Sequence, residues 1–419
     1  KPVVFEKNER PGGMLTYGIP SFKLEKDVIE AEVEVIRLMG AEFRYGVEVG
    51  RDVTLDELRA QGFKAFYVAI GCQGGRLAGI PGEGAEDVTV AVDFLREVNS
   101  GKIDSLSGRT IVVGGGNVAI DVARNACRLG SEHVEMFCLE SDAQMPASEE
   151  ERREAIEDGA HISCGWGPKE IHLDEAGRVC GITFKRCTRV FDDEGRFAPE
   201  YDENDLRRVD ADRVVMSIGQ SIVWGDLLAG SKVELGRGQG ALADPQTYQT
   251  AEPDIFVGGD VYTGPSFAID AIAAGHEAAV SIHRFVQPGS TLTIGRNQRR
   301  YTALDRDDVV IESYDNASRE VAHVDREREK AAPFSEYVET FTEEQVRAET
   351  ARCLGCGASI VDPNKCIGCG LCTTKCAFDA IHLDRDRPEC STMVKYEQKL
   401  PSLGKYALKR AIKIKFGRK

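Results

Sequence analysis

The most constraining stretch of the sequence is an apolar run that passes directly into a glycine-rich turn. The β-branched residues 111–113 are typical of a buried parallel strand, and apolar residues at helical spacing follow the turn. Between them, Gly114 allows a tight turn, Gly116 lets the backbone approach a pyrophosphate, and Ala119 permits close helix–strand packing. The pattern predicts a dinucleotide-binding turn, with an ordinary glycine-rich strand–helix turn as the alternative. The expected nucleotide contacts are Gly114, Gly116, Asn117, Val118 and Ala119.

Length, charge and cysteine content narrow the class of protein. The 419 residues are enough for two or three domains, and the net charge of −16 argues against nucleic acid as a general partner. The sequence has no apolar run of about 18 residues and no charged-then-apolar leader, so we expect neither a transmembrane segment nor a signal peptide. Seven of the 13 cysteines crowd into residues 353–390. Such a cluster predicts metal ligation in a reducing compartment, and therefore a cytoplasmic location.

The chain opens on a strand that ends in an acid, over residues 2–6. In a doubly wound nucleotide-binding unit such a strand is the second, and its terminal acid, here Glu6, binds ribose hydroxyls. The first strand and its glycine turn belong about 20–30 residues earlier. We therefore expect this sequence to begin inside a domain. The alternative is that Glu6 is an ordinary acid at the end of a strand.

Further elements are indicated along the first 290 residues, including an antiparallel meander with turns at 175–177 and 192–195. Strands are expected at 43–49, 65–70, 134–139, 214–218 and 255–257, and helices at 25–40, 148–158 and 266–286. The charge-rich residues 291–345 are expected to form an extended connector with little core of its own. A helix over 343–352 is expected to lead into the cysteines.

A series of short motifs occurs in a fixed order. They are residues 12–20 (GGMLTYGIP), 80–82 (IPG), 114–121 (GGGNVAID), 145–147 (MPA), 218–220 (IGQ) and 258–260 (GGD). The series resembles the glutamate synthase small-subunit family of FAD- and NAD(P)-dependent oxidoreductases. That family includes pyridine-nucleotide subunits of electron-bifurcating ferredoxin oxidoreductases and hydrogenase-type complexes.

The resemblance implies an α/β fold with two nested Rossmann-like domains and a small ferredoxin-like module. FAD would lie in residues 1–107 together with 233–290, and the pyridine nucleotide in 108–232. The ferredoxin-like module would occupy residues 346–392, followed by a basic tail over 393–419.

The resemblance also implies roles for individual residues. Glu6 would bind the FAD ribose, Leu15 would lie along the flavin, and Asp260 would hold the ribityl chain. The helix after Gly264 would direct its N-terminal amides at the flavin ring. The glycine turn for the FAD pyrophosphate is the part of the family pattern that this sequence lacks. The cofactor contacts expected in this way are Glu6, Gly12, Gly13, Leu15, Gly71, Gly219, Gly259, Asp260 and Ala268.

The strand after the glycine-rich turn bears on the choice of nucleotide. NADP-using relatives commonly carry two arginines where Leu139 and Glu140 stand. A carboxylate accepts hydrogen bonds from both ribose hydroxyls and repels a 2′-phosphate. Glu140 therefore favours NAD(H) over NADP(H). The alternative is that Glu140 points to solvent and a basic residue elsewhere binds the phosphate of NADP.

The route by which electrons leave is constrained by the cysteines. A disulfide reductase needs a cysteine pair beside the flavin, but the loop after Gly13 has no cysteine and the nucleotide domain has no C-x-x-C. The scattered cysteines are better interpreted as small core residues. The C-terminal cysteines remain as the electron carrier.

Those C-terminal cysteines have the spacing of a ferredoxin. The pattern C-x2-C-x2-C-x3-C predicts a 4Fe–4S cluster held by Cys366, Cys369, Cys372 and Cys376. A second cluster is possible, with Cys376 joined by Cys353, Cys356 and Cys390. Zinc is the alternative, because the spacing from Cys353 to Cys369 resembles a zinc ribbon. Zinc would leave the ferredoxin spacing unexplained.

The sequence thus predicts a flavin-dependent NAD(P)H oxidoreductase subunit that passes single electrons through 4Fe–4S to a partner. The expected partners are other redox subunits of flavin or Fe–S type and ferredoxin, in a complex that could bifurcate electrons. No acid–base residue is needed for hydride transfer, so none is assigned as catalytic. The basic tail could be a solvated helix, a helix on a lipid surface or an arm that docks on an acidic partner. The alternatives are a glutamate-synthase-type small subunit and an inert Fe–S scaffold.

Overall fold

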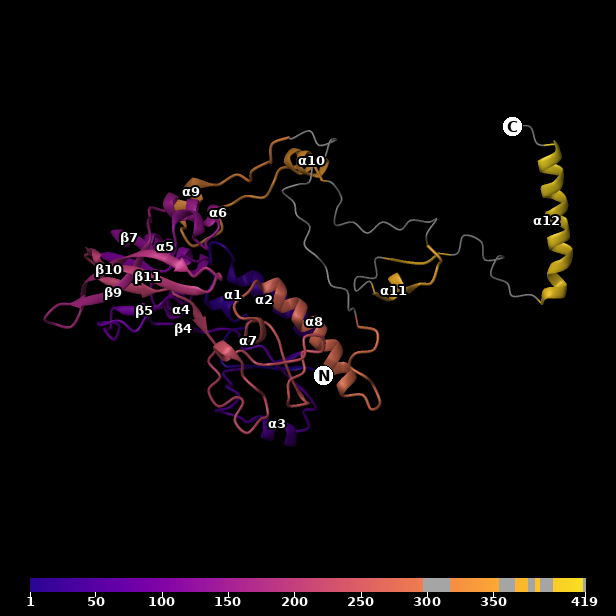
Figure 1. Ribbon diagram of the computed structural model, residues 1–419, viewed down its shortest axis with the longest axis horizontal. Helices are drawn as coiled ribbons and strands as arrows, with labels where there is room; N and C mark the ends of the chain where they lie inside the picture. The colour runs from indigo at the N-terminus through magenta and orange to yellow at the C-terminus, as the bar shows by residue number, and fades with distance from the viewer. Residues whose placement is uncertain (297–316, 354–365, 376–380, 385–394, 417–419) are drawn as a thin grey trace. The chain divides into compact units, whose positions relative to one another are not determined.

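A computed structural model describes residues 1–296, 317–353, 366–375, 381–384 and 395–416 (Figure 1). The chain divides into two compact units, Lys1–Val346 and Arg347–Lys419, and each is described by itself. Among the described residues, none of the helices combines the length and apolar character that crossing a bilayer requires.

The first unit contains a five-stranded parallel sheet built around the glycine-rich turn. Its strand order is β5 (Val88–Val90), β12 (Arg213–Met216), β6 (Arg109–Val113), β7 (His133–Cys138) and β8 (His161–Cys164). Alternate residues of these strands face opposite sides. Val112 and Met136 pack against helices, whereas Ile111 and Phe137 pack against the antiparallel meander. The sheet is therefore buried on both faces, as its apolar strands predict.

The two covering layers come from the elements around the sheet. On one face lie α4 (Ala91–Asn99), α5 (Asn117–Arg128) and α6 (Glu149–Glu157), preceded by the short η1 (Asp142–Gln144). On the other lies the expected meander of β9 (Trp166–Leu173), β10 (Val179–Phe191) and β11 (Phe197–Val209). The rings of Phe137 and Phe184 stack at 3.9 Å between centroids, joining meander to sheet.

One boundary differs from the sequence-based expectation, which placed residues 1–107 in the FAD domain. Strand β5 pairs in parallel with β12, and α4 buries Phe94 and Leu95 in the core shared with α5. These residues therefore belong to the nucleotide-binding sheet. The crossing between the two parts is a short antiparallel ribbon of β4 (Gly74–Gly75) and β13 (Gln220–Ser221).

The part expected to bind flavin is built from the chain before β4 and the chain after β13. Two parallel strand pairs form it, β1 (Val3–Glu6) with β2 (Glu42–Tyr45) and β3 (Phe66–Val68) with β14 (Ile255–Val257). Its helices are α1 (Met14–Tyr17), α2 (Lys26–Leu38), α3 (Leu55–Ala60), α7 (Asp260–Thr263) and α8 (Ala268–Phe285), with the short η2 (Arg237–Gln239). A separate apolar core, including Leu55, Val68 and Ile255, confirms that this is a distinct layer of packing.

The segment expected to be an extended connector has structure of its own. It contains α9 (Arg326–Ala331) and the start of α10 (Glu343–Ala351), and Val324 forms a β-bridge with Val338. Tyr337 is buried. The charge-rich sequence hid this packing, because a single aromatic anchor gives no periodic pattern. The second unit contains the end of α10, α11 (Leu371–Lys375) and α12 (Tyr396–Phe416).

Candidate nucleotide and iron–sulfur sites

The turn after β6 has the backbone that a dinucleotide requires. Gly114 has φ of 144°, and a Cβ there would lie 2.2 Å from the carbonyl oxygen of Ser217, so no side chain fits. Gly116 is the N-cap of α5, and a Cβ there would have no atom within 4 Å. The space over Gly116 and the helix N-terminus together fit an anion. Ala119 is fully buried against the sheet, as its place in the pattern requires.

The acid at the end of β7 lies beside this turn. A Cβ built on Gly115 would be 3.0 Å from Oε2 of Glu140, so the carboxylate folds back toward the glycines. Asn117 accepts a hydrogen bond from the Ser148 backbone N–H at 3.1 Å, which ties the turn to the start of α6. Gly219 follows β12, the strand beside β6, and also has positive φ, of 118°. The strand ends therefore bring Gly114, Glu140 and Gly219 to one edge of the sheet.

On the flavin side, the ends of β3 and β14 meet. A Cβ built on Gly71 would lie 3.9 Å from Oδ2 of Asp260, whose other oxygen accepts from the Ser266 N–H at 3.3 Å. Burial raises the pKa of Asp260 above its usual value. Gly259 has φ of 64° and directs the chain from β14 into α7. A carboxylate beside an open glycine fits the role of holding a polyhydroxyl chain.

The other expected flavin residues lie on two further segments. Glu6 ends β1, and its Oε1 accepts from the backbone N–H and the side-chain amide of Asn8, at 2.9 and 2.7 Å. Gly12 and Gly13 lead into α1, which contains Leu15, and Ala268 is the first residue of α8. The residues present fit the adenosine and flavin ends of FAD.

Two functional candidates were missed by sequence reasoning. The guanidinium of Arg96 on α4 donates to Oδ1 of Asn8 and Oε1 of Gln73, both at 2.8 Å. It thus links the Glu6 segment to the loop after Gly71. Lys26 donates to the carbonyl oxygen of Leu15 at 3.0 Å, and burial lowers its pKa to about 8. Neither residue has a sequence signal, because both occupy ordinary positions on amphipathic helices.

The scattered cysteines include one close pair. Cys138 and Cys164 face each other across β7 and β8, with their sulfur atoms 3.6 Å apart. Burial, then the neighbouring thiol, raises the pKa of Cys138 far above its usual value. Burial likewise raises the pKa of Cys72, next to Gly71, to about 11. The raised pKa values of Cys138 and Cys72 fit core residues rather than nucleophiles.

The described ferredoxin cysteines lie in the second unit. Cys353, Cys366, Cys369 and Cys372 are exposed, and the Gly368 N–H donates to the sulfur of Cys366 at 3.4 Å. Amide donation to sulfur suits a thiolate ligand. Cys356, Cys376 and Cys390 lie outside the described residues. Within the described ranges, no three His, Cys, Asp or Glu side chains are grouped as metal ligands.

Comparison with known sequences identifies the family. The family described as pyridine nucleotide-disulphide oxidoreductase matches residues 4–275. The chain belongs to this family. A second family, described as 4Fe-4S binding domain, matches residues 359–382. The chain therefore combines an oxidoreductase of the FAD and pyridine-nucleotide type with a 4Fe–4S module, as the motifs predicted.

Named relatives agree with the resemblance to the glutamate synthase small subunit. The chain is 34% identical to the NADP(+)-dependent formate dehydrogenase subunit beta of Moorella thermoacetica, over 85% of this chain and 51% of that protein. It is 34% identical to the glutamate synthase [NADPH] small chain of Escherichia coli, over 68% of this chain and 64% of that protein. It is 32% identical to the NAD-dependent dihydropyrimidine dehydrogenase subunit PreT of Escherichia coli, over 68% and 62%. The chain thus spans about half to two thirds of the length of these relatives.

Solved structures confirm the fold. FprA of Mycobacterium tuberculosis, solved with NADPH, superposes with a TM-score of 0.56 at 19% identity, covering 67% of this chain and 77% of that one. The thioredoxin reductase of T. acidophilum superposes with a TM-score of 0.50 at 17% identity, covering 67% of this chain and 89% of that one. The predicted α/β class with nested Rossmann-like domains is therefore correct.

Proposed function

We propose that this chain is the pyridine-nucleotide subunit of a multisubunit redox complex, in which hydride passes between NAD(P)H and FAD and single electrons leave through 4Fe–4S. The observation that carries the proposal is the presence of both modules on one chain whose loop after Gly13 has no cysteine. When bound, FAD couples a two-electron hydride to one-electron steps. The protein supplies binding and orientation.

The roles of this chain's residues follow from the site. The turn at Gly114 and Gly116 presents the N-terminus of α5 to the pyrophosphate of the pyridine nucleotide. On the flavin side, Glu6 accepts from the adenosine ribose and Asp260 from the ribityl chain. Gly12, Gly13 and Leu15 line the flavin, and Arg96 holds the Glu6 segment in place through Asn8.

Glu140 supports NAD(H) as the preferred nucleotide. Its carboxylate lies beside Gly115, where it can accept from both ribose hydroxyls and repel a 2′-phosphate. The relatives differ in this respect, since two are named for NADP(H) and one for NAD. Flavin bleaching by NADH and NADPH decides the matter. The double variant Leu139→Arg, Glu140→Arg should shift the preference toward NADPH, whereas Glu150→Arg, an exposed acid on α6, should not.

The match to the formate dehydrogenase subunit favours the complex over a glutamate-synthase-type subunit. That match covers 85% of this chain, whereas the glutamate synthase match covers 68%. The expected partners are redox subunits and ferredoxin, and bifurcation of electrons is a further possibility. The thiols of the cluster require a reducing compartment, so we place the protein in the cytoplasm. An inert scaffold would show no flavin bands bleached by NADH in the purified complex.

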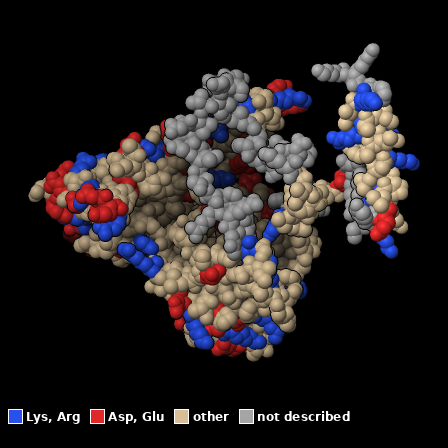
Figure 2. All heavy atoms as spheres, turned by 45° about the vertical axis from the view of Figure 1, so that its right-hand side comes forward, with Lys and Arg blue, Asp and Glu red and all other residues tan. Residues whose placement is uncertain are grey.

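The tail supports docking on an acidic partner. In α12, Lys405, Lys409 and Lys413 follow one line of the helix, and Leu400 and Ile414 lie on the other side. Figure 2 shows the basic side chains standing out along this helix. Reversing the three lysines to glutamate should weaken binding of the native partner and flatten its salt dependence. Binding that keeps its affinity and salt dependence would contradict this role.

A further inference from the structure

Residues 324–338, which we call the bracket, form a closed loop just before the Fe–S module. The Val324–Val338 bridge and a hydrogen bond from the Asp325 N–H to the Tyr337 carbonyl, at 2.9 Å, close it. Asp325 also caps α9 within the loop. The bracket is therefore a small folded element and not an extended linker.

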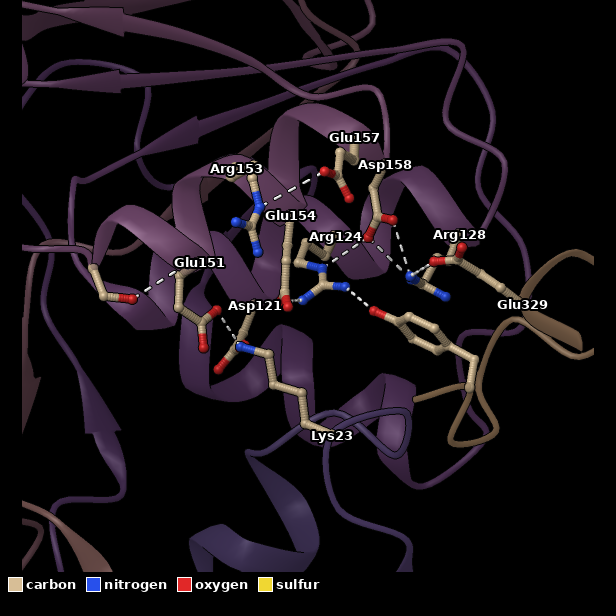
Figure 3. A network of polar contacts seen from close by, with 12 residues as sticks. Lys23, Asp121, Arg124, Arg128, Glu151, Arg153, Glu154, Glu157, Asp158 and Glu329 are labelled. Carbon is tan, nitrogen blue, oxygen red and sulfur yellow. Dashed lines mark hydrogen bonds and ion pairs between the residues drawn. The ribbon is translucent and has the colours of Figure 1, made fainter. Parts of the chain in front are cut away.

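Tyr337 anchors the bracket on the nucleotide-binding part. Its hydroxyl accepts from the guanidinium of Arg124 on α5. Arg124 is 1% exposed and also donates to Asp158 at 2.7 Å and to Glu154, as Figure 3 shows. Burial raises the pKa of Tyr337, so its hydroxyl stays protonated.

Arg128, one helical turn further along α5, makes the second anchor. It donates to Asp158 at 2.9 Å, to Glu329 of α9 at 2.6 Å and to the carbonyl of Pro333 at 2.7 Å. The side chain of Phe334 packs against the core shared by α4, α5 and α6. The bracket is thus held by these contacts of Arg124 and Arg128, by an ion pair between Arg326 and Glu157 of α6 at 2.7 Å, and by apolar burial.

The flavin part meets α5 at the same place. The ring of Phe22 lies under both guanidiniums, at 4.7 Å from Arg124 and 4.3 Å from Arg128. Buried charged networks seldom add net stability, and in some proteins they fix segments in register. Here the network joins the flavin part, the helix behind the glycine-rich turn, and the bracket.

We propose that the bracket anchors the segment that leads into the Fe–S module to the nucleotide-binding part. Glu329 and Tyr337 act as positioning residues for electron transfer from flavin to cluster. This inference rests on the proposed function. In that transfer the reduced flavin loses one electron and the oxidised cluster gains it. From Val338 to Cys353 the chain is about 15 residues, and releasing residues 324–338 would add about 15 more to this tether. Because effective concentration falls as about the −3/2 power of tether length, doubling the tether should slow the transfer about threefold.

The test uses the full chain carrying FAD and cluster. The double variant Glu329→Gln, Tyr337→Ala removes the bracket side chains that Arg124 and Arg128 contact. It leaves the Arg124–Asp158 pair, the contact of Arg128 with the Pro333 carbonyl and the Arg326–Glu157 ion pair. Glu327→Gln, on the exposed side of the same helix, is the matched control. Hydrogen exchange over residues 324–338 should rise about tenfold in the double variant and stay unchanged in the control. Flavin bleaching by NADH should keep its rate, while electron arrival at the cluster slows about threefold.

Tyr337→Phe provides a milder variant, which keeps the buried ring and should show a smaller rise in exchange. Unchanged exchange in the double variant would overturn the anchoring role of these residues. Faster exchange with an unchanged transfer rate would overturn the positioning role. If the unaltered protein shows no flavin-to-cluster transfer, the proposed function fails, and hydrogen exchange still reports on the anchor.

Discussion

Replacing Lys23 by methionine removes the cation that joins the flavin part to the nucleotide-binding part. Its ammonium lies 2.6 Å from Asp121 on α5 and also contacts Glu151 on α6. The three side chains are 14 to 24% exposed, so the pair is mostly shielded from water. Breaking a buried pair costs about 3–5 kcal/mol, and partial exposure reduces this to about 2–3 kcal/mol at pH 8.

The loss should depend on pH because burial already raises the pKa of Asp121 from 3.8 to about 6. Between about pH 4 and 6 the folded state therefore binds a proton that the unfolded state does not, and its stability at this site increases as the pH falls. Without Lys23 the pKa rises further. Protonation then relieves the unpaired carboxylate, so the variant should lose less stability at pH 5.5 than at pH 8.

Urea unfolding at both pH values measures this loss. Lys23→Met should lower the midpoint at pH 8 without changing the denaturant slope. The double variant Lys23→Met, Asp121→Asn should recover most of the loss at pH 8. Lys64→Met, at an exposed site, should change little. An equal loss at pH 8 and 5.5, or a double variant as unstable as the single one, would refute the reasoning.

Three further predictions concern the cofactor sites. Asp260→Ala should lose flavin while the fold persists, and a full flavin-to-protein absorbance ratio would contradict this. Cys369→Ala should keep NADH-dependent flavin bleaching but stop reduction of ferredoxin or the native partner, and surviving partner reduction would make the module structural. Gly114→Ala should raise the KM for NADH more than tenfold and cost about 2 kcal/mol, because its Cβ would meet Ser217. Gly116→Ala, with open space at its Cβ, should leave stability nearly unchanged.

The parts of the fold that the sequence predicted are those with a local pattern. The apolar run into Gly114, the alternating meander and the amphipathic helices each satisfy one period over their own length. Strand β5 has three residues, and its partner β12 is far along the chain, so no local signal assigns it to the nucleotide-binding sheet. Long-range pairing of this kind is set by tertiary packing.

The residues of the candidate site also fall into those that a local sequence pattern predicts and those that it does not. Glycines and acids at strand ends carry their chemistry in their sequence context. Gly114, Glu140 and Asp260 do follow strands β6, β7 and β14, and their roles toward nucleotide and flavin stay predictions. Residues that act through packing have no such sequence context. Arg124 is a charged residue on an apolar helix face, and it is buried there because Asp158, Glu154 and Tyr337 accept its hydrogen bonds.

The strand order of the nucleotide-binding sheet has a consequence for synthesis of the chain. Strand β12 lies between β5 and β6, although these precede it by about 120 and 100 residues. While the chain emerges from the ribosome, the edges of β5 and β6 that pair with β12 stay unpaired until residues 213–216 have been made. The nascent chain therefore carries an open sheet edge throughout synthesis of the meander, a state in which aggregation competes with folding.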